Sequence, residues 1–204
     1  MPVASDAGRM SATRDFVFVR HGETDWNREK RVQGSTGGSI NEAGRDQARA
    51  LARLLWEVPL QAVYASALPR ALETASYVAG PHGVAVVADP RLNEIHHGEW
   101  EGLAEANLPD ADLYRRWRED PSSCELPGAE TLLSARDRAV AAMREIAARH
   151  PADKGLVAVV SHQILIAVIK CYVLDRPFSQ IRRHALSVAS YEVLTVGEGF
   201  TPRP

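Results

Sequence analysis

Short apolar runs alternate along this chain with longer segments whose apolar residues recur at helical spacing. The run at residues 16–19 is followed by a helical pattern from Asn41, and the run at residues 62–65 by a helix that contains Arg70. Continuously apolar strands that alternate with helices are typical of a largely parallel sheet with helices on both faces. We therefore expect an α/β fold, built as a three-layer α/β/α sandwich with a mostly parallel central sheet.

The helix after the first strand has both a capping residue and an apolar face. The side chain of Asn41 can cap the helix, and Glu42 lies in its first turn, where the helix dipole favours an anion. Apolar residues at helical spacing predict that one face packs on the sheet. That predicted face carries Ala48, Leu51, Leu54, Leu55 and Val58.

The second half of the chain repeats the alternation. A third strand is expected at residues 84–87, a long helix at 130–150, a fourth strand at 156–160 and a last strand at 187–196. A further helix is expected to start near His162. The predicted buried face of the long helix carries Leu133, Arg136, Val140, Met143 and Ala147.

Two segments depart from this alternation. Residues 1–15 are small and polar and lack the apolar core of a signal peptide, so they predict a flexible N-terminal tail. Residues 96–127 are irregular and rich in charged and aromatic side chains, which suggests a lid-like excursion from the fold. The remaining sequence predicts a single α/β domain over residues 16–204.

Composition and local polarity exclude several classes of partner. The formal net charge of −2 gives no support for a nucleic-acid partner. Residues 156–174 are apolar, but polar side chains around His162 would be costly in a bilayer, so no membrane partner is expected. Cys124 and Cys171 form no Cys-x-x-Cys pair, which argues against structural zinc and favours a cytoplasmic location.

Polar residues with catalytic potential follow the predicted strands. In folds of this class, ligands bind outside the carboxyl ends of the strands. The residues at these ends, or one step into the next helix, are therefore expected to converge on one edge of the sheet. They are Arg20, His21, Arg70, Glu94 and His162.

Two arginines that face one point suggest a bound phosphate. The guanidinium groups of Arg20 and Arg70 can fork onto phosphate oxygens, and free N–H groups at the helix start would add to the site. We assign His21 as the neutral nucleophile, its ring held by a backbone carbonyl in the turn at Gly22. His162 would bind the transferring phosphoryl group and stabilise developing charge.

Glu94 is the expected proton donor to the leaving alkoxide and the later base toward water. This role requires partial burial that keeps the carboxyl group protonated near neutral pH. Glu23, Glu99 and Glu101 compete for the same role. No metal and no cofactor are expected, because the arginines supply the positive charge.

These segments resemble the signature of the histidine phosphatase superfamily, which includes the cofactor-dependent phosphoglycerate mutases. The signature is Arg20-His21-Gly22-Glu23-Thr24, followed by Trp26-Asn27. The resemblance implies the α/β sandwich, a phosphohistidine mechanism, and phosphate contacts from Thr24 and Asn27. The other matching segments are Gln33-Gly34, Asn41-Glu42-Ala43-Gly44, residues 66–75 around Arg70, Leu92-Asn93-Glu94, residues 98–102, residues 127–131 with Arg138, and Val160-Ser161-His162.

The chain departs from the family pattern in two places that border the expected substrate site. In the loop that begins with Gln33 and Gly34, the family commonly has Asp, Pro, Leu and Thr where this chain has Gly37, Ser39, Ile40 and Asn41. The role of the Gly37-Gly38-Ser39 segment stays open. Gln163 follows the second histidine, where the family often has Gly, and its side chain is expected to narrow the pocket.

Three functions remain in competition. The resemblance favours a metal-independent phosphomonoesterase acting on a small phosphorylated metabolite, because the similar mutases are usually longer and tend to have Ser or Thr in place of Gln33. The alternatives are a phosphoglycerate mutase and a non-catalytic phospholigand-binding or scaffold protein. The sequence does not name the substrate, and it leaves open a homodimer formed through the last strand.

Other polar clusters are interpreted without a function of their own. The His96-His97 pair matches no metal-ligand spacing and is expected to lie in a loop near the pocket. The basic run at residues 115–118 is interpreted as a solvated face of a lid helix that could meet an anionic substrate.

Overall fold

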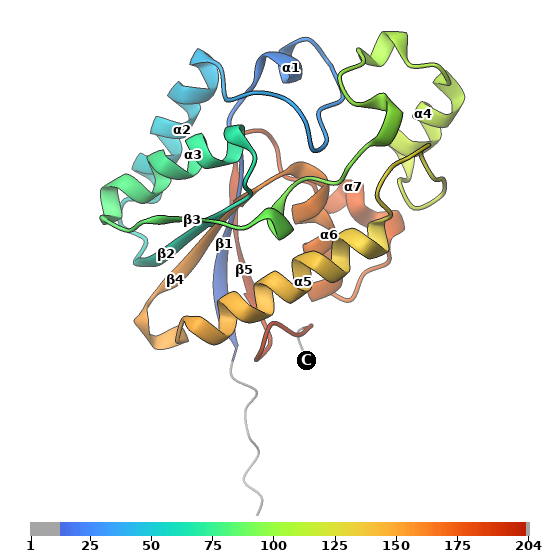
Figure 1. Ribbon diagram of the computed structural model, residues 1–204. Helices are drawn as coiled ribbons and strands as arrows, with labels where there is room; N and C mark the ends of the chain where they lie inside the picture. The colour runs from blue at the N-terminus through green and yellow to red at the C-terminus, as the bar shows by residue number, and fades with distance from the viewer. Residues whose placement is uncertain (1–12, 203–204) are drawn as a thin grey trace, which may run out of the picture.

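A computed structural model describes residues 13–202 and contains a central five-stranded sheet (Figure 1). The strands lie in the order β3-β2-β4-β1-β5, and β5 alone is antiparallel to its neighbour in this sheet. The predicted mostly parallel sheet is therefore confirmed. The strands are β1 Arg14–Arg20, β2 Leu60–Ala65, β3 Val86–Ala88, β4 Leu156–Ser161 and β5 Tyr191–Val196.

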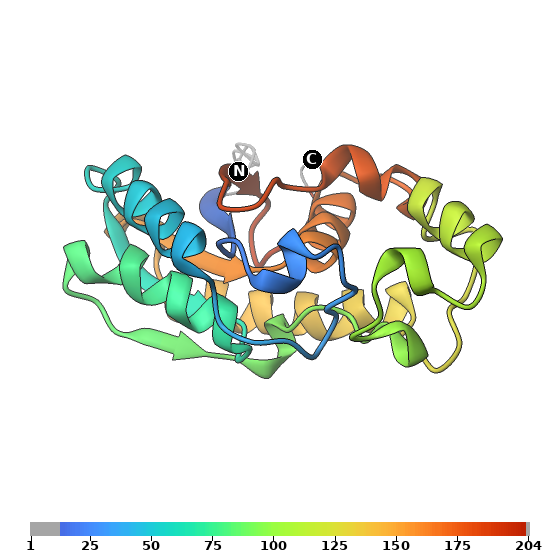
Figure 2. The same ribbon diagram turned by 90° about the horizontal axis from the view of Figure 1, so that it is seen from above.

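Helices cover both faces of this sheet, which confirms the three-layer sandwich. Figure 2 shows α2 and α3 on one side of the strands and α5 and α6 on the other. Along β1, Phe16 and Phe18 pack toward α5 and α6, whereas Val17 and Val19 pack toward α2 and α3, as the alternation of side chains in a strand requires. The helices are α1 Asp25–Arg28, α2 Glu42–Leu54, α3 Pro69–Ala79, α4 Ala111–Glu119, α5 Leu132–Arg149, α6 Gln163–Val173 and α7 Ile181–His184.

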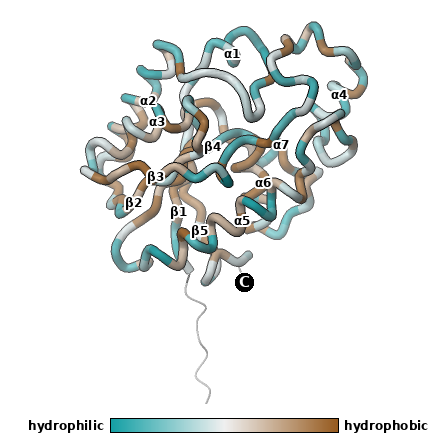
Figure 3. The backbone as a smooth tube through the Cα atoms, viewed as in Figure 1, coloured by the Kyte–Doolittle hydropathy of each residue, from teal (hydrophilic) through white to brown (hydrophobic). Residues whose placement is uncertain are grey.

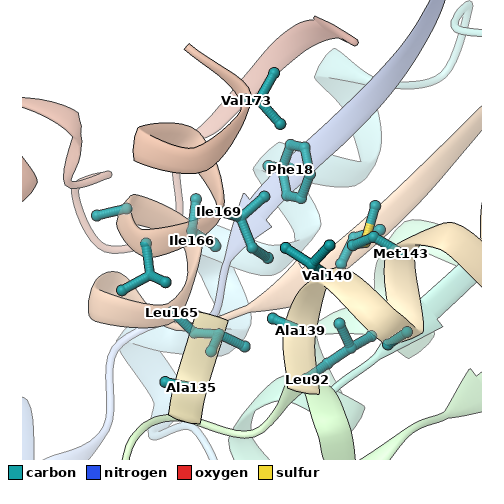
Figure 4. Close-up of a cluster of buried hydrophobic side chains, with 14 of the residues drawn as sticks. Phe18, Leu92, Ala135, Ala139, Val140, Met143, Leu165, Ile166, Ile169 and Val173 are labelled. Atoms are coloured by element: carbon teal, nitrogen blue, oxygen red, sulfur yellow. The ribbon is translucent and has the colours of Figure 1, made fainter. Parts of the chain in front are cut away.

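The apolar stretches of the chain gather around the strands (Figure 3). The larger cluster lies between the sheet, α5 and α6, where Phe18, Met143 and Ile169 are fully buried (Figure 4). Such burial removes apolar surface from water and is the main stabilising contribution in a domain of this size. The segment at residues 156–174 is a buried strand followed by a buried helix, as predicted, and no helix within residues 13–202 could cross a membrane.

The lid-like excursion at residues 96–127 is irregular apart from α4 and two short 3₁₀ helices. Its aromatic rings pack on one another, with the Trp100 ring centroid 5.8 Å from that of Tyr114 and 6.4 Å from that of Trp117, and Trp100 and Trp117 are buried in the larger core cluster. Figure 1 shows α4 beyond the carboxyl ends of the parallel strands. The 3₁₀ helices within residues 13–202 are Gly80–His82, Pro90–Leu92, Gly98–Trp100, Glu105–Asn107, Ala152–Lys154 and Phe178–Gln180.

The edges of several elements differ from the predictions. The third strand covers residues 86–88 instead of 84–87, and the last strand begins at Tyr191 instead of residue 187. Both are edge strands, whose limits depend on pairing with a single neighbour. Arg14 and Asp15 belong to β1, because they pair with β5, so the predicted tail is too long there; residues 1–12 of it lie outside the described residues.

Two predicted helix faces need correction. Leu133 of α5 is exposed and Arg136 is only partly buried, because the buried face of this helix is rotated toward Ala135, Ala139 and Met143. Val58 lies beyond the end of α2, and Leu54 is 65% exposed. The cap of that helix is as predicted: the Asn41 side-chain oxygen accepts a hydrogen bond from the backbone N–H of Gly44.

Candidate active site

A cavity of about 440 Å³ opens where the parallel strands end. Two of the residues predicted for the site, Thr24 and His162, are buried and do not line its wall. The predicted site residues that do line it are Arg20, His21, Asn27, Gln33, Gly34, Arg70, Glu94 and Gln163.

His21 follows β1 directly, and its backbone is fixed by a continuation of the sheet. Its N–H donates to the carbonyl of Ser161, the last residue of β4, at 3.1 Å. The ring Nδ1 lies 2.8 Å from the carbonyl oxygen of Gly22. Because a carbonyl only accepts, Nδ1 must carry the hydrogen, which leaves Nε2 with a free lone pair. The predicted bond between this ring and the turn at Gly22 is confirmed.

The surroundings of His21 keep its ring neutral. Burial, followed by the positive charges of Arg70 and Arg20, lowers the pKa of His21 well below its ordinary value. The bond to the Gly22 carbonyl opposes this effect and does not reverse it. At neutral pH the imidazole is therefore unprotonated at Nε2, as a nucleophile requires.

His162 is fully buried beside His21, with the two ring centroids 5.0 Å apart. Its Nδ1 accepts a hydrogen bond from Arg70 Nε at 3.2 Å, and its Nε2 lies 2.7 Å from the Ser66 hydroxyl. That hydroxyl in turn donates to the side-chain oxygen of Asn93 at 2.8 Å. This network fits a neutral His162 that carries its hydrogen on Nε2, and burial followed by the charge of Arg70 lowers its pKa well below the ordinary value.

The network around His162 includes two residues to which the sequence analysis assigned no role. Ser66 follows β2, and Asn93 precedes Glu94 in sequence. The signal available in the sequence was that both residues are expected at the same edge of the sheet as the other site residues. Direct contact between His162 and a phosphoryl group stays a prediction, because this arrangement places the ring behind the cavity wall.

Arg70 is buried and Arg20 is partly buried, and neither forms an ion pair within residues 13–202. Burial lowers the pKa of both guanidinium groups to about 10, so both stay charged at neutral pH. Arg70 donates to the carbonyl oxygens of Gly34 and Thr36 at 2.6 and 2.7 Å, and Arg20 to that of Leu186 at 2.9 Å. A bound dianion would supply a direct ionic partner for both.

The carboxylate of Glu94 lies against the start of α6. It accepts hydrogen bonds from the backbone N–H groups of Ile95, Ile164 and Leu165, each at 3.0 Å. The sequence predicts free N–H groups at this helix start that bind the substrate anion. That prediction was wrong for Ile164 and Leu165, because Glu94 already uses their N–H groups.

The other carboxylates that competed with Glu94 lie outside the cavity wall. Glu23 accepts a hydrogen bond from the Asn41 side chain, and Glu99 is exposed. Glu101 accepts from the backbone N–H groups of Ser35 and His97 and holds the loop in place. Among the four candidates, Glu94 is the one that lines the cavity.

Arg138 of α5 holds the backbone that carries Glu94. Its guanidinium donates to the carbonyl oxygens of Arg91 and Asn93 at 2.8 and 2.7 Å, and to that of Glu94 at 3.3 Å. Two further bonds, both 2.7 Å, join it to the Glu130 carboxylate. Because the planar guanidinium of Arg138 is hydrogen-bonded on two sides, it holds this segment rigidly.

Glycines give the loop at residues 33–38 the room that Arg70 needs. Gly34 has φ +54°, and a Cβ there would collide with the Glu101 carboxylate. Gly37 has φ +100°, and a Cβ there would lie 3.4 Å from Arg70 Nη1. The departure from the family at Gly37 thus leaves space beside the arginine, while Ile40 in the same loop is buried in the core.

Thr24 orients other site residues instead of lining the cavity. Its hydroxyl caps α1 by accepting from the backbone N–H of Asn27 at 3.1 Å, and it lies 3.0 Å from the side-chain oxygen of Gln33. The Asn27 side chain reciprocates by accepting from the Thr24 N–H at 3.1 Å. Thr24 therefore positions two predicted substrate contacts.

The two adjacent histidines of the lid segment separate in the structure. His97 lines the cavity, whereas His96 is exposed and lies against the carbonyl of Gly128. In the described part of the chain, no three His, Cys, Asp or Glu side chains are grouped so that they could hold a metal ion.

Comparisons with known proteins agree with this geometry. The model of the histidine phosphatase superfamily (branch 1) matches residues 16–201. The chain is 32% identical over 185 residues to phosphoserine phosphatase 1 of Hydrogenobacter thermophilus, covering 90% of this chain and 87% of that protein. It is 36% identical over 157 residues to a metal-independent phosphoserine phosphatase of Arabidopsis thaliana, covering 74% of this chain and 65% of the plant protein.

A solved structure of mycobacterial glucosyl-3-phosphoglycerate phosphatase in complex with VO3 is also similar. It superposes with a TM-score of 0.79 at 31% identity, covering 88% of this chain and 90% of that one. The region matched by the family model includes His21, His162, Arg20 and Arg70. The chain belongs to the histidine phosphatase superfamily.

Proposed function

We propose that this chain is a phosphoric monoester hydrolase of the histidine acid phosphatase type, acting on small phosphorylated metabolites. The observation that carries the proposal is the state of His21: a neutral ring held through Nδ1 by the Gly22 carbonyl, beside two charged arginines that form no ion pair within the described residues. A neutral imidazole surrounded by fixed positive charge is suited to attack a phosphate dianion and to little else.

In the first step, His21 Nε2 attacks the phosphorus atom and the bond from phosphorus to the ester oxygen breaks. Arg20 and Arg70 bind the phosphoryl oxygens and offset the charge that develops on them. Glu94 in the cavity wall gives a proton to the departing alkoxide, so the alcohol leaves neutral. The product of this step is a phosphohistidine and an ionised Glu94.

In the second step, water replaces the alcohol. Glu94 takes a proton from the water as its oxygen attacks phosphorus, and the bond between phosphorus and Nε2 breaks. Inorganic phosphate leaves, and both His21 and Glu94 return to their starting states. The fixed tautomer of His162 keeps its Nδ1 toward Arg70 in both steps and thereby orients that guanidinium.

We further propose that the reaction needs no metal ion and that it takes place in the cytoplasm. The two guanidinium groups supply the charge stabilisation that a divalent cation supplies in other phosphatases. The name of the plant relative as a metal-independent phosphoserine phosphatase supports the first point, and the two free cysteines are compatible with the second.

The test is release of inorganic phosphate from p-nitrophenyl phosphate and from a panel of phosphorylated metabolites, with EDTA present. We expect release from several substrates without added bisphosphoglycerate. Exchange of phosphate between the hydroxyl groups of phosphoglycerate, dependent on bisphosphoglycerate, would indicate the mutase instead. Binding of phosphorylated ligands without turnover between pH 5 and 8 would indicate the non-catalytic alternative.

A further inference from the structure

The cavity continues past the phosphate-binding residues into an outer wall. We define the outer wall by four residues from two separate elements: Tyr114, Trp117 and Arg118 of α4, and Arg182 of α7. The two elements are about 64 residues apart in sequence and meet where the Arg182 guanidinium lies over the Trp117 ring, 4.6 Å from its centroid. The lid segment and α7 therefore build this side of the cavity together.

Arg182 is partly buried, and its guanidinium is held by an aromatic ring and a backbone carbonyl instead of a carboxylate. Its Nη2 donates to the backbone carbonyl of Trp117 at 3.1 Å, while its Nε is buried without a hydrogen-bond partner. Within residues 13–202 it makes no ion pair. A shielded guanidinium without an acidic partner is costly unless a ligand completes it.

The neighbouring arginines of the cavity differ in this respect. Arg31 forms an ion pair with Glu29 at 2.7 Å and donates to the Gly102 carbonyl. Arg118 lies 3.5 Å from the Glu105 carboxylate. Arg20 and Arg70 are assigned to the phosphoryl group. Among the other described arginines that line the cavity, Arg182 is the one that forms no ion pair.

The charge of the whole cavity supports the same conclusion. Six basic and two acidic side chains line it, which gives a formal charge of +4 with neutral histidines. A phosphomonoester dianion offsets two of these charges, so a substrate with another anionic group would fit the cavity better. The basic residues are Arg20, Lys30, Arg31, Arg70, Arg118 and Arg182, and the acidic ones are Glu94 and Glu105.

We propose that Arg182 binds a carboxylate of the substrate, so that the chain selects phosphomonoesters that carry a carboxylate group. This inference rests on the proposed phosphatase function and names its substrate class. Stacking on Trp117 fixes the plane of the guanidinium, and its Nη1, which has no hydrogen-bond partner among the described residues, is left for a carboxylate oxygen. A cavity of about 440 Å³ suits a small metabolite with both groups.

The test compares two ligands that differ only in this group: 3-phosphoglycerate, and glycerol 3-phosphate, which has a hydroxymethyl group in place of the carboxylate. Affinities are measured by calorimetry in a His21→Ala background, so that turnover does not consume the ligand. We expect 3-phosphoglycerate to bind about 10- to 100-fold more tightly, as for a charge-assisted pair in a shielded site. Adding Arg182→Met should bring the ratio of the two affinities close to one.

The matched control is Arg183→Met, because Arg183 is the adjacent residue on α7, is exposed and does not line the cavity. It should leave the ratio unchanged, and Arg182→Lys should keep part of the preference by retaining the charge without the fork. Equal affinity for the two ligands in the His21→Ala background would overturn the proposal. The proposal would also be overturned if the Arg182→Met variant kept the preference for 3-phosphoglycerate while its melting temperature was unaltered.

Failure of this inference is distinguishable from failure of the proposed function. Hydrolysis of p-nitrophenyl phosphate by the unaltered chain tests the phosphatase activity and involves no carboxylate. Hydrolysis without a carboxylate preference overturns the role of Arg182 and leaves the phosphatase intact. A carboxylate preference in binding without any hydrolysis supports the role of Arg182 and contradicts the phosphatase.

Discussion

The floor and the outer wall of the cavity differ in the elements that carry their side chains. The floor, formed by Arg20, His21, Arg70 and Glu94, follows directly on strands or lies against the start of a helix, and each side chain has a hydrogen bond that fixes it. The outer wall is carried by the lid segment and the short helix α7, which meet where Arg182 lies over the Trp117 ring.

We infer from this difference that the floor carries out the reaction and that the outer wall selects the substrate. Groups that must attack phosphorus or move a proton need fixed positions, and rigid strand ends provide them. Groups that recognise the rest of the substrate lie on segments that vary more easily without disturbing the sheet. Substitutions in the floor are therefore expected to affect turnover, whereas substitutions in the outer wall are expected to affect the choice of substrate.

The largest effect is expected from removal of the nucleophile in the floor. His21→Ala should lower kcat for p-nitrophenyl phosphate by on the order of 10⁴-fold, because no other group can form the covalent intermediate. Phosphate release under saturating substrate is the measurement. The exposed His96 provides the control, and His96→Ala should retain activity; comparable losses in both variants would contradict the assignment.

The next effect in size is expected from the carboxyl group of Glu94. Glu94→Gln should lower kcat by about 10²- to 10³-fold for an alkyl phosphate, because the alkoxide then leaves without a proton. The loss should be smaller for p-nitrophenyl phosphate, whose leaving group is stable as an anion. Kinetics with both substrates test this, with Glu99→Gln as the exposed control; equal losses with both leaving groups would remove Glu94 as the proton donor.

A smaller effect should follow when the support of Glu94 is loosened. Arg138→Met removes the bonds to the carbonyls of Arg91, Asn93 and Glu94, and kcat should fall by about 10-fold. The loss should again be larger for an alkyl phosphate than for p-nitrophenyl phosphate, which a general loss of stability would not produce. Arg136→Met on the exposed side of the same helix is the control.

The smallest effect concerns stability against acid. The folded-state pKa of His21 lies well below the unfolded value of about 6.5, so between these values the unfolded chain binds more protons. The free energy of unfolding should therefore fall as the pH drops below about 6.5. His21→Ala removes this dependence, and its loss of stability between pH 7.5 and 5.5 should be smaller than that of the unaltered chain by about 1 kcal/mol.

Urea unfolding at the two pH values measures this difference. His96→Ala replaces an exposed ring and should follow the unaltered chain at both values. An acid sensitivity that is the same with and without His21 would show that folding does not lower the pKa of this ring, contrary to the neutral nucleophile assigned here.

The sequence predicts the floor because its signals are local. An apolar strand followed by Arg20 and His21, or the capping residue Asn41 before a helix, is visible in a few consecutive residues. The use of the α6 N–H groups by Glu94 depends on contacts between residues about 70 apart, which no local pattern contains. The role of Arg182 likewise depends on where two distant segments meet.

The same distinction explains the errors in the fold. The central strands β1, β2 and β4 are apolar on both faces and are recognised from composition alone. The edge strands β3 and β5 are partly exposed, so their limits follow from pairing and not from their own residues. The outward side of α5 was misplaced because its many alanines fit more than one helical face.

The central claim is that the phosphoryl group passes through His21, and rapid acid-free quenching during turnover tests it most directly. Mass spectrometry of the quenched chain should find a single phosphoryl group on His21, stable in base and labile in acid, and absent from the His21→Ala variant. A phosphoryl group on another residue, or steady hydrolysis by the His21→Ala variant at the rate of the unaltered chain, would contradict the account.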